Sequence, residues 1–369
     1  MLLLATVVAL AWANSPWRGT YALFWHSPLV NEHVTLQRIV NDGLMTVFFL
    51  VVGLEIRSEL HDGTLSSAKR AVVPVIAAAG GVVTPALIYL AIAGPVGLGR
   101  GWAVPTPTDI AFAIGVLAVL GERVPRPVRV LLLALAVIDD VAAVLVIALF
   151  YSSGIGGLGL LAAASAVGLV LLFQRLAIRS PFAYLLPAAI LWLGLLQAGV
   201  HPTLTGVILG LLSPTAPRAN QLALSSVRRV ERALHPWVAF GVMPLFALAN
   251  AGLPVDSFIP RTAESATLMW AVAIALVLGK PLGICIFTWV TARSGLGRLP
   301  AALTWRGVLL VGCLGGIGFT MSLFLTNLAF SDPTLIAASK SAVLMASAVA
   351  GTIGFLIGRF VLFPDRSLP

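Results

Sequence analysis

Two adjacent aspartates, Asp139 and Asp140, stand at the centre of an otherwise apolar stretch, LALAVIDDVAAVLV. A charged side chain at the centre of a bilayer costs at least about 2.5–3.5 kcal/mol, so such residues are functional candidates. Two carboxylates close together in a low dielectric resist being ionised at the same time, and one of them can then hold a proton near neutral pH. The pair suits a site that accepts either a cation or protons, although it could also serve only to hold helices together.

Lys280 lies near the middle of a second apolar stretch, residues 267–290, at a depth similar to that of the two aspartates. An isolated ammonium buried in this way would give up its proton, whereas a carboxylate partner stabilises the charged form. We therefore expect Lys280 to pair with an aspartate, in an ion pair that protons or sodium can break. The alternative is an ion pair with a purely structural role.

A third group of candidates follows two prolines in the segment GWAVPTPTDIAF. Pro105 and Pro107 lack a backbone N–H and disfavour helix in the residue before them, so the sequence predicts a break here. A carboxylate at the start of the following helix, Asp109, neutralises the positive end of the helix dipole. Thr108 and backbone carbonyls freed by the break offer oxygen ligands that suit Na⁺ or Li⁺. Asp109 could alternatively be only an N-cap.

A glycine-rich segment predicts a second break, within residues 305–329. Gly315, Gly316 and Gly318 lie within four residues, and each costs a continuous helix about 1 kcal/mol relative to alanine. Irregular backbone at membrane depth is tolerated only where it is buried in protein or lines a wet cavity. The two breaks occupy matching places in two trios of spans, residues 71–151 and 267–362, a pattern that points to a transporter's binding site.

The elements that must position these residues are membrane helices. The chain has 369 residues, of which 59% are hydrophobic and only 10% charged, with a mean hydropathy of +1.01. A soluble domain usually carries about 25% charged residues, and a spanning helix needs roughly 20 apolar ones. We predict an all-α polytopic membrane protein, a single domain over residues 1–369 with twelve transmembrane helices at roughly 1–13, 40–56, 71–94, 102–121, 128–151, 155–174, 182–199, 201–213, 236–253, 267–290, 305–329 and 335–362.

The net charge of +9 reflects membrane orientation rather than nucleic-acid binding. Basic residues concentrate in one alternate set of loops, and the other set holds only Arg18, Arg38, Arg100 and Arg261. Because cytoplasmic loops carry the excess of basic residues, both termini are expected in the cytoplasm. The first predicted span, MLLLATVVALAWA, could alternatively be a cleaved signal peptide.

The motifs favour a secondary transporter that exchanges a small cation for protons, and they argue against enzymes and channels. An intramembrane protease would carry its own signature motifs, and neither the channel signature TVGYG nor an ATP-binding Walker sequence occurs. Cys285 and Cys313 lie in apolar runs without metal-ligand spacing, so we expect no cofactor. A sodium-coupled carrier of organic solutes remains the main alternative.

The chain resembles the NhaA family of sodium/proton antiporters. The resemblance rests on long motifs that follow in order along the chain: NDGLMTVFFLVVGLEIRSEL (41–60), PTPTDIAFAIGVLAVLGERVP (105–125), LALAVIDDVAAVLVIALFYS (133–152), GVHPTLTGVILG (199–210), LHPWVAFGVMPLFALANAGL (234–253), GKPLGI (279–284) and GGIGFTMSLFL (315–325). It implies inverted repeats and two discontinuous, crossing helices in the bacterial inner membrane. It also implies electrogenic, pH-regulated exchange of two external protons for one cytoplasmic Na⁺ or Li⁺ by alternating access, serving sodium and pH homeostasis.

The resemblance also assigns roles to residues. Asp139 and Asp140 become the carboxylates that carry the transported Na⁺ and protons, Lys280 becomes the partner of Asp139, and Thr108 and Asp109 support the site. The resemblance also implies a pH-regulation set of residues, which comprises Asp42 on the second helix and Glu55 and Glu231 in a cytoplasmic funnel. Arg232 belongs to the same set and occupies a position where a histidine is expected. From the sequence alone, the acidic residues near the second span could equally be a solvated face.

The partners expected from the resemblance are membrane lipids and the transported Na⁺, Li⁺ and H⁺. The stretch FWHSPLVNEHVTLQRIVND, between the first two spans, is shorter than the extracytoplasmic hairpin region that holds the family's dimer. The resemblance therefore leaves homodimer formation open.

Overall fold

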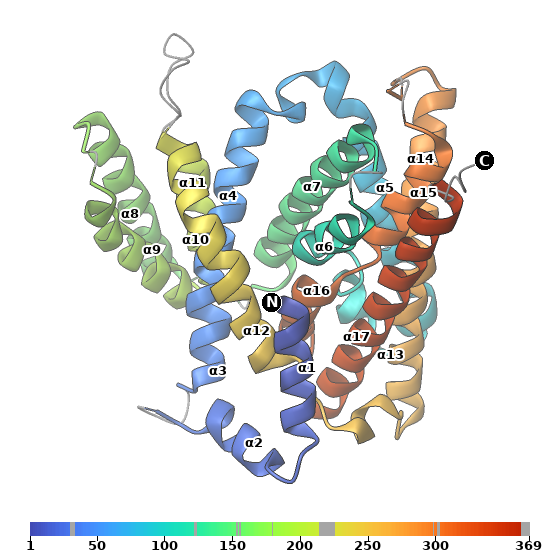
Figure 1. Cartoon of the computed structure of the whole chain (residues 1–369). Coiled ribbons are helices and arrows are strands. Elements are labelled where there is room, and N and C mark those ends of the chain that lie inside the picture. The colour runs from blue at the N-terminus through green and yellow to red at the C-terminus, as the bar shows by residue number, and fades with distance from the viewer. Residues whose placement is uncertain are drawn as a thin grey trace. The chain divides into compact units, whose positions relative to one another are not determined.

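In the computed structural model, the regular secondary structure of the part of the chain that it describes consists of helices (Figure 1). It describes residues 1–29, 34–121, 124–152, 154, 156–178, 180–213, 226–297, 299–300 and 303–362. Within these ranges the only β-type contact is an isolated bridge between Pro28 and Thr35. The predicted all-α class is confirmed.

The described residues contain seven helices that are long and apolar enough to cross a membrane, or eight if the bent pair of residues 305–315 and 319–329 counts as one span. The other four predicted spans contain shorter helices, at Leu2–Ala13, Ile110–Leu120, Leu185–Gln197 and Leu204–Leu212. The count of twelve spans remains a prediction, because these four helices are too short to cross a bilayer as straight helices.

The chain forms two compact units, residues 1–63 with 144–252 and residues 64–143 with 253–369. The boundary falls inside the long helix α7, Arg126–Phe150, so that Asp139 and Asp140 belong to the second unit. Both predicted trios of spans lie in the second unit, apart from the end of α7. The single domain and its internal repeats remain predictions.

The first unit is built from short and medium helices, some of which approach each other closely at glycines. Its helices are α1 Leu2–Ala13, α2 Arg18–His26, α3 Leu36–Arg38, α4 Met45–Asp62, α8 Gly157–Arg175, α9 Leu185–Gln197, α10 Leu204–Leu212, α11 Ser226–Trp237 and α12 Met243–Asn250. Helices α4 and α10 touch through glycines: a Cβ on Gly53 would lie 2.7 Å from the carbonyl oxygen of Val207. Any larger side chain would push the two helices apart.

The second unit holds the helices that carry the candidate site. They are α5 Ala68–Ala93, α6 Ile110–Leu120, the first part of α7, α13 Ala263–Ile274, α14 Lys280–Arg293, α15 Trp305–Gly315, α16 Phe319–Ala329 and α17 Pro333–Leu356. Helices α5 and α14 also meet at glycines, since a Cβ on either Gly80 or Gly283 would clash with the carbonyl oxygen of the other. This contact fixes the position of α14, whose first residue is Lys280.

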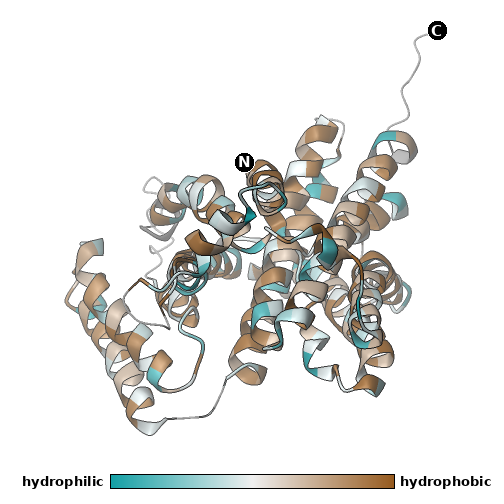
Figure 2. Cartoon of the chain, turned by 90° about the horizontal axis from the view of Figure 1, so that it is seen from below, coloured by the Kyte–Doolittle hydropathy of each residue, from teal (hydrophilic) through white to brown (hydrophobic). Residues whose placement is uncertain are grey.

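Hydrophobic residues make up much of the helices, which are coloured brown in Figure 2, and large apolar side chains are exposed on both units. Leu158 on α8 is 82% exposed, and Trp270 on α13 and Trp289 on α14 are also more than half exposed. A water-soluble protein rarely exposes large contiguous apolar patches. These surfaces therefore fit a lipid environment.

Candidate functional site

Lys280 owes its position to an irregular turn of helix. Residues Ala275–Gly279, directly before it, form a π-helical turn, and Pro281, directly after it, has no N–H to donate back along the helix. Such wide turns inside α-helices are frequent at functional sites. The side chain of Lys280 is completely buried.

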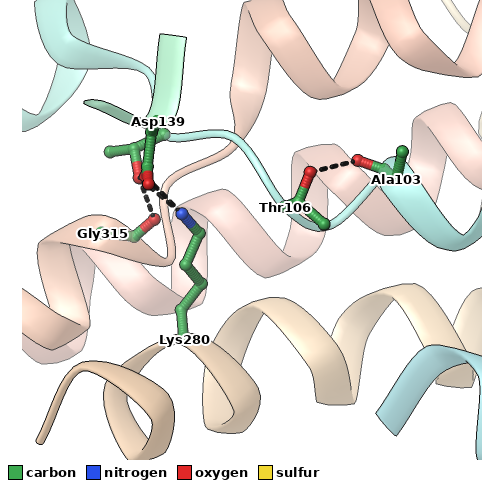
Figure 3. Close-up of polar contacts among 6 residues, drawn as sticks. Ala103, Thr106, Asp139, Lys280 and Gly315 are labelled. Atoms are coloured by element: carbon green, nitrogen blue, oxygen red, sulfur yellow. Dashed lines mark hydrogen bonds and ion pairs between the residues drawn. The ribbon is translucent and has the colours of Figure 1, made fainter. Parts of the chain in front are cut away.

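Lys280 meets Asp139 in the interior of the second unit (Figure 3). It also contacts Thr108. Its ammonium Nζ donates to Asp139 Oδ2 at 2.5 Å and to Thr108 Oγ1 at 2.9 Å. Asp139 is 1% exposed and Thr108 fully buried, so water does not screen this ion pair. The structure thus brings together three of the residues that the sequence singles out.

Thr108 links the ion pair to the glycine-rich segment. Its hydroxyl lies 2.6 Å from Asp139 Oδ2 and 2.9 Å from the carbonyl oxygen of Gly315, and its single proton can serve one of them at a time. Thr108 therefore joins residues that follow the proline-rich break to the end of α15.

Asp139 uses only one of its two carboxylate oxygens. Oδ2 receives Lys280 and Thr108, whereas the buried Oδ1 has no hydrogen-bond partner. A buried oxygen without a donor is energetically costly unless something else occupies the position. The neighbouring Asp140 is 2% exposed, and its negative charge also acts on Lys280. The site therefore has oxygen atoms available to a cation or a proton.

Asp109 caps two helices at once. Its Oδ1 accepts from the backbone N–H of Phe112 in α6 at 3.0 Å, and its Oδ2 accepts from the N–H of Thr320 in α16 at 3.1 Å and from the Thr320 hydroxyl at 2.6 Å. Its own N–H donates to the carbonyl oxygen of Ile317 at 2.7 Å. The N-cap predicted for α6 is present, and the same carboxylate also neutralises the positive end of α16.

Both predicted interruptions occur in the backbone. Pro105 and Pro107 lie in a buried, non-helical stretch that ends where α6 begins at Ile110. The Thr106 hydroxyl between them donates to the carbonyl oxygen of Ala103 at 2.8 Å (Figure 3).

The second interruption separates α15 from α16, which are bent by 44° relative to each other. It takes in Gly316 and Gly318, and Gly315 ends α15. A Cβ on Gly316 would lie 2.6 Å from the carbonyl oxygen of Leu276, so only glycine fits there without a shift. Hydrogen bonds between the two interruptions show that they are adjacent.

The residues of the predicted pH-regulation set lie in the first unit and do not form one cluster. Glu55 on α4 and Glu231 on α11 are close enough for their charges to interact, together with that of Glu59. Asp42 lies thirteen residues before Glu55, in a π-helical turn at Ile39–Leu44, and pairs with Arg38 at 3.3 Å. Arg232 is exposed on α11.

Sequence reasoning missed two residues that the structure places at the second break. Thr320 binds Asp109, and the Ser347 hydroxyl of α17 accepts from the N–H of Phe319 at 3.1 Å. A hydroxyl residue in the first turn after a glycine-rich break is a usable signal for Thr320. Ser347 stands in an apolar helix with other small residues, where nothing in the sequence marks it.

The site contains the buried ion pair of Asp139 and Lys280, near two adjacent interruptions in apolar helices. This combination is typical of a membrane protein that transports ions. Comparison with known sequences gives the particular family. The family described as Na⁺/H⁺ antiporter 1 matches residues 1–357. The chain belongs to this family, and it is a multi-pass bacterial membrane protein.

Curated relatives carry the same assignment over nearly their whole lengths. The chain is 52% identical to the Na⁺/H⁺ antiporter NhaA of Acidovorax sp. (strain JS42), covering 97% of this chain and 88% of that protein. It is 47% identical to Na⁺/H⁺ antiporter NhaA 2 of Sorangium cellulosum (strain So ce56), covering 100% and 88%. The NhaA protein of Bartonella tribocorum is 43% identical, covering 100% and 91%. The predicted family is confirmed.

Proposed function

We propose that this chain exchanges cytoplasmic Na⁺ or Li⁺ for external protons, with two protons for each cation, so that every cycle moves net charge. The observation that carries the proposal is the state of Asp139, whose Oδ2 is shared by Lys280 and Thr108 while the buried Oδ1 accepts no hydrogen bond. Because one oxygen of the carboxylate accepts hydrogen bonds and the other accepts none, the carboxylate can bind a cation or a proton while its existing hydrogen bonds remain.

Asp139 and Asp140 are the proposed carriers. In the deprotonated state their carboxylates hold the transported Na⁺, and the cation competes with Lys280 for the charge of Asp139. When protons bind to the carboxylates instead, the negative charge that retains Na⁺ is lost, and the cation leaves. Binding of one kind of ion thus excludes the other, which is the condition for exchange.

Thr108 and Asp109 support this site. The Thr108 hydroxyl contacts Asp139 directly, and Asp109 ties the beginnings of α6 and α16 together. Alternating access requires the site to open to one side of the membrane at a time. The joined breaks are the proposed hinge region, because irregular backbone can change conformation with fewer lost helical hydrogen bonds than a continuous helix.

A pH-regulation role for Glu55, Glu231, Arg232 and Asp42 belongs to the same proposal. The interacting charges of Glu55, Glu59 and Glu231 support it for the first two residues. Arg232 stays charged over the whole physiological range, unlike a histidine. It would contribute a constant charge to the sensor rather than a switch.

The proposed location is the inner membrane with both termini in the cytoplasm, supported by the distribution of basic residues between alternate loops. Tagging each terminus with a protease-cleavable epitope in intact and broken cells tests this orientation. Homodimer formation is a separate question, which mass photometry in detergent or nanodiscs answers.

The central test uses purified protein in proteoliposomes that hold a pH gradient reported by an acidotropic dye. Na⁺ or Li⁺ added outside should dequench the dye, K⁺ should not, and Asp140→Asn is the matched inactive control. Clamping the membrane potential with K⁺ and valinomycin should raise the rate if exchange is electrogenic. A substrate-dependent current without proton movement would instead favour a sodium-coupled carrier of organic solutes.

A further inference from the structure

The first two amides of α16 receive their acceptors from two other helices. Helix α16 begins at Phe319 after Gly318, which stands at the N-cap position and has no side chain to accept a hydrogen bond. The N–H groups of a first helical turn have no partner within their own helix. Here Asp109 accepts from Thr320, and Ser347 on α17 accepts from Phe319.

The contact made by Ser347 differs from those of most serines and threonines in this unit. Thr326, Ser341 and Thr288 donate to the carbonyl oxygen four residues earlier in their own helices. Ser347 uses its oxygen as an acceptor for another helix at a distance of 28 residues along the chain, and it is 1% exposed. Water therefore cannot replace it as the acceptor for Phe319.

A short series of bonds connects Ser347 to the ion pair. Phe319, which Ser347 binds, is followed by Thr320, which binds Asp109. The residue before Asp109 is Thr108, whose hydroxyl contacts both Asp139 and Lys280. A shift at the start of α16 is therefore passed to the Asp139 site through directly bonded neighbours.

We propose that Ser347 is a positioning residue for cation binding: by capping α16 from α17, it holds the helix start where Asp109 and Thr108 keep the Asp139 site in its cation-binding geometry. This inference rests on the proposed Na⁺ exchange. Removing the acceptor leaves the buried N–H of Phe319 without a partner, so that Asp109 alone compensates the positive end of α16. The local potential then becomes more positive, and Na⁺ binds more weakly.

The test compares four variants with the wild type in proteoliposomes. Ser347→Ala removes the acceptor, and Ser347→Thr retains it. Ser322→Ala is the matched control, because the buried Ser322 hydroxyl of α16 makes no hydrogen bond and its loss removes an equal volume without a bond. Ser339→Ala breaks a hydroxyl contact with Thr326 elsewhere between α16 and α17.

The expected result is an apparent Na⁺ constant raised about three- to tenfold in Ser347→Ala, with a maximal rate near that of the wild type. Ser347→Thr should recover most of the affinity, and the two control variants should retain it even if their melting temperatures fall. An unchanged Na⁺ constant in Ser347→Ala, an equal rise in Ser322→Ala, or no recovery in Ser347→Thr would overturn the inference.

Amide hydrogen exchange separates this inference from the proposed function. In Ser347→Ala, the Phe319 amide should exchange faster than in the wild type, whether or not the protein transports Na⁺. Unchanged protection at Phe319 refutes the cap itself. A wild type that shows no Na⁺-dependent dequenching refutes the proposed function, whereas a responsive wild type and an equally responsive Ser347→Ala variant refute only the positioning role.

Discussion

Asp109 and Asp139 are two buried carboxylates of the same unit, and they differ in how their oxygens are used. Both oxygens of Asp109 accept from neutral donors, the N–H groups of Phe112 and Thr320 and the Thr320 hydroxyl. Asp139 directs one oxygen to a cation, Lys280, and leaves the other without a hydrogen bond. Burial and charge alone do not distinguish the two, because both are at most 1% exposed.

This difference in hydrogen bonding suits one carboxylate to stabilising the fold and the other to ion exchange. A carboxylate whose acceptors are filled by the backbone of two helices cannot take up a proton without losing those bonds. A carboxylate held at one oxygen by an ammonium and a hydroxyl can exchange the ammonium for a proton or a cation. We therefore propose an architectural role for Asp109 and a transport role for Asp139 with Asp140.

The largest effect is expected from neutralising the transport pair. Asp140→Asn should abolish exchange, because an amide can neither release a proton nor balance the charge of Na⁺. Asp139→Asn should be severely impaired for the same reason and should also disturb Lys280. The measurement is Na⁺-induced dequenching in proteoliposomes, with expression and melting temperature checked first. Wild-type dequenching by Asp140→Asn would remove the basis of the assignment.

Lys280→Ala should produce the next largest effect. It leaves Asp139 buried without its cationic partner, and losing one member of a buried ion pair typically costs about 3–5 kcal/mol. We expect a lower melting temperature and weaker exchange that carries less net charge per cycle. Lys280→Arg is the control, because it retains the positive charge. Unchanged melting together with unchanged current in Lys280→Ala would contradict the importance of the pair.

The residues that carry charge could be identified from the sequence because each violates the apolar pattern around it. Asp139, Asp140 and Lys280 stand out in long hydrophobic runs, and the structure brings Asp139 and Lys280 into contact. The two breaks were predictable as well, since proline and closely spaced glycine interrupt helices for local reasons.

The residues that bind the site residues could not be predicted from the sequence, because they are brought together only by the tertiary fold. Nothing local indicates that Asp109 also binds Thr320, which is 211 residues away. Hydropathy likewise identifies apolar segments but does not show how many of their residues are helical. The fourth predicted span, for example, contains a helix of only 11 residues. Tertiary burial allows a shorter helix than a lipid-exposed span requires.

The architectural role of Asp109 leads to a third prediction. Asp109→Asn replaces one accepting oxygen by an amide group that faces donors, so a buried donor loses its partner at a cost of about 1–3 kcal/mol. Melting temperature should fall, while the apparent Na⁺ constant should change less than in Lys280→Ala. If Asp109→Asn instead eliminated Na⁺ dependence without altering melting, Asp109 would be a cation ligand and the contrast with Asp139 would be wrong.

A pH series at varied Na⁺ tests the competition at the transport pair directly. Na⁺ binds the deprotonated carboxylates, so acid removes its site, and apparent Na⁺ affinity must fall as pH drops. The apparent constant should rise up to about tenfold per pH unit for each proton released, once the pH is below the titration range of the pair. Asp109→Asn should keep this slope. A constant that is flat between about pH 6 and 9 would rule out shared-site competition.

The smallest effect concerns the first unit, where Arg232 lies on α11 at the position for which the family resemblance implies a histidine. A histidine changes charge between about pH 5 and 8, whereas an arginine does not. A sensor built around Glu55 and Glu231 would act on the maximal rate, in contrast to the competition at Asp139, which acts on affinity. We expect the wild-type rate at saturating Na⁺ to vary less with pH than that of Arg232→His.

The decisive measurement is therefore the maximal rate, taken from a full Na⁺ titration at each pH for the wild type and Arg232→His. Arg232→Lys is the control, because it keeps a fixed positive charge and should follow the wild type. If only Arg232→His loses maximal rate more steeply as the pH falls, the additional pH dependence is due to the histidine. If all three proteins lose maximal rate equally steeply, Arg232 takes no part in the switch, and the pH dependence belongs to the carboxylates.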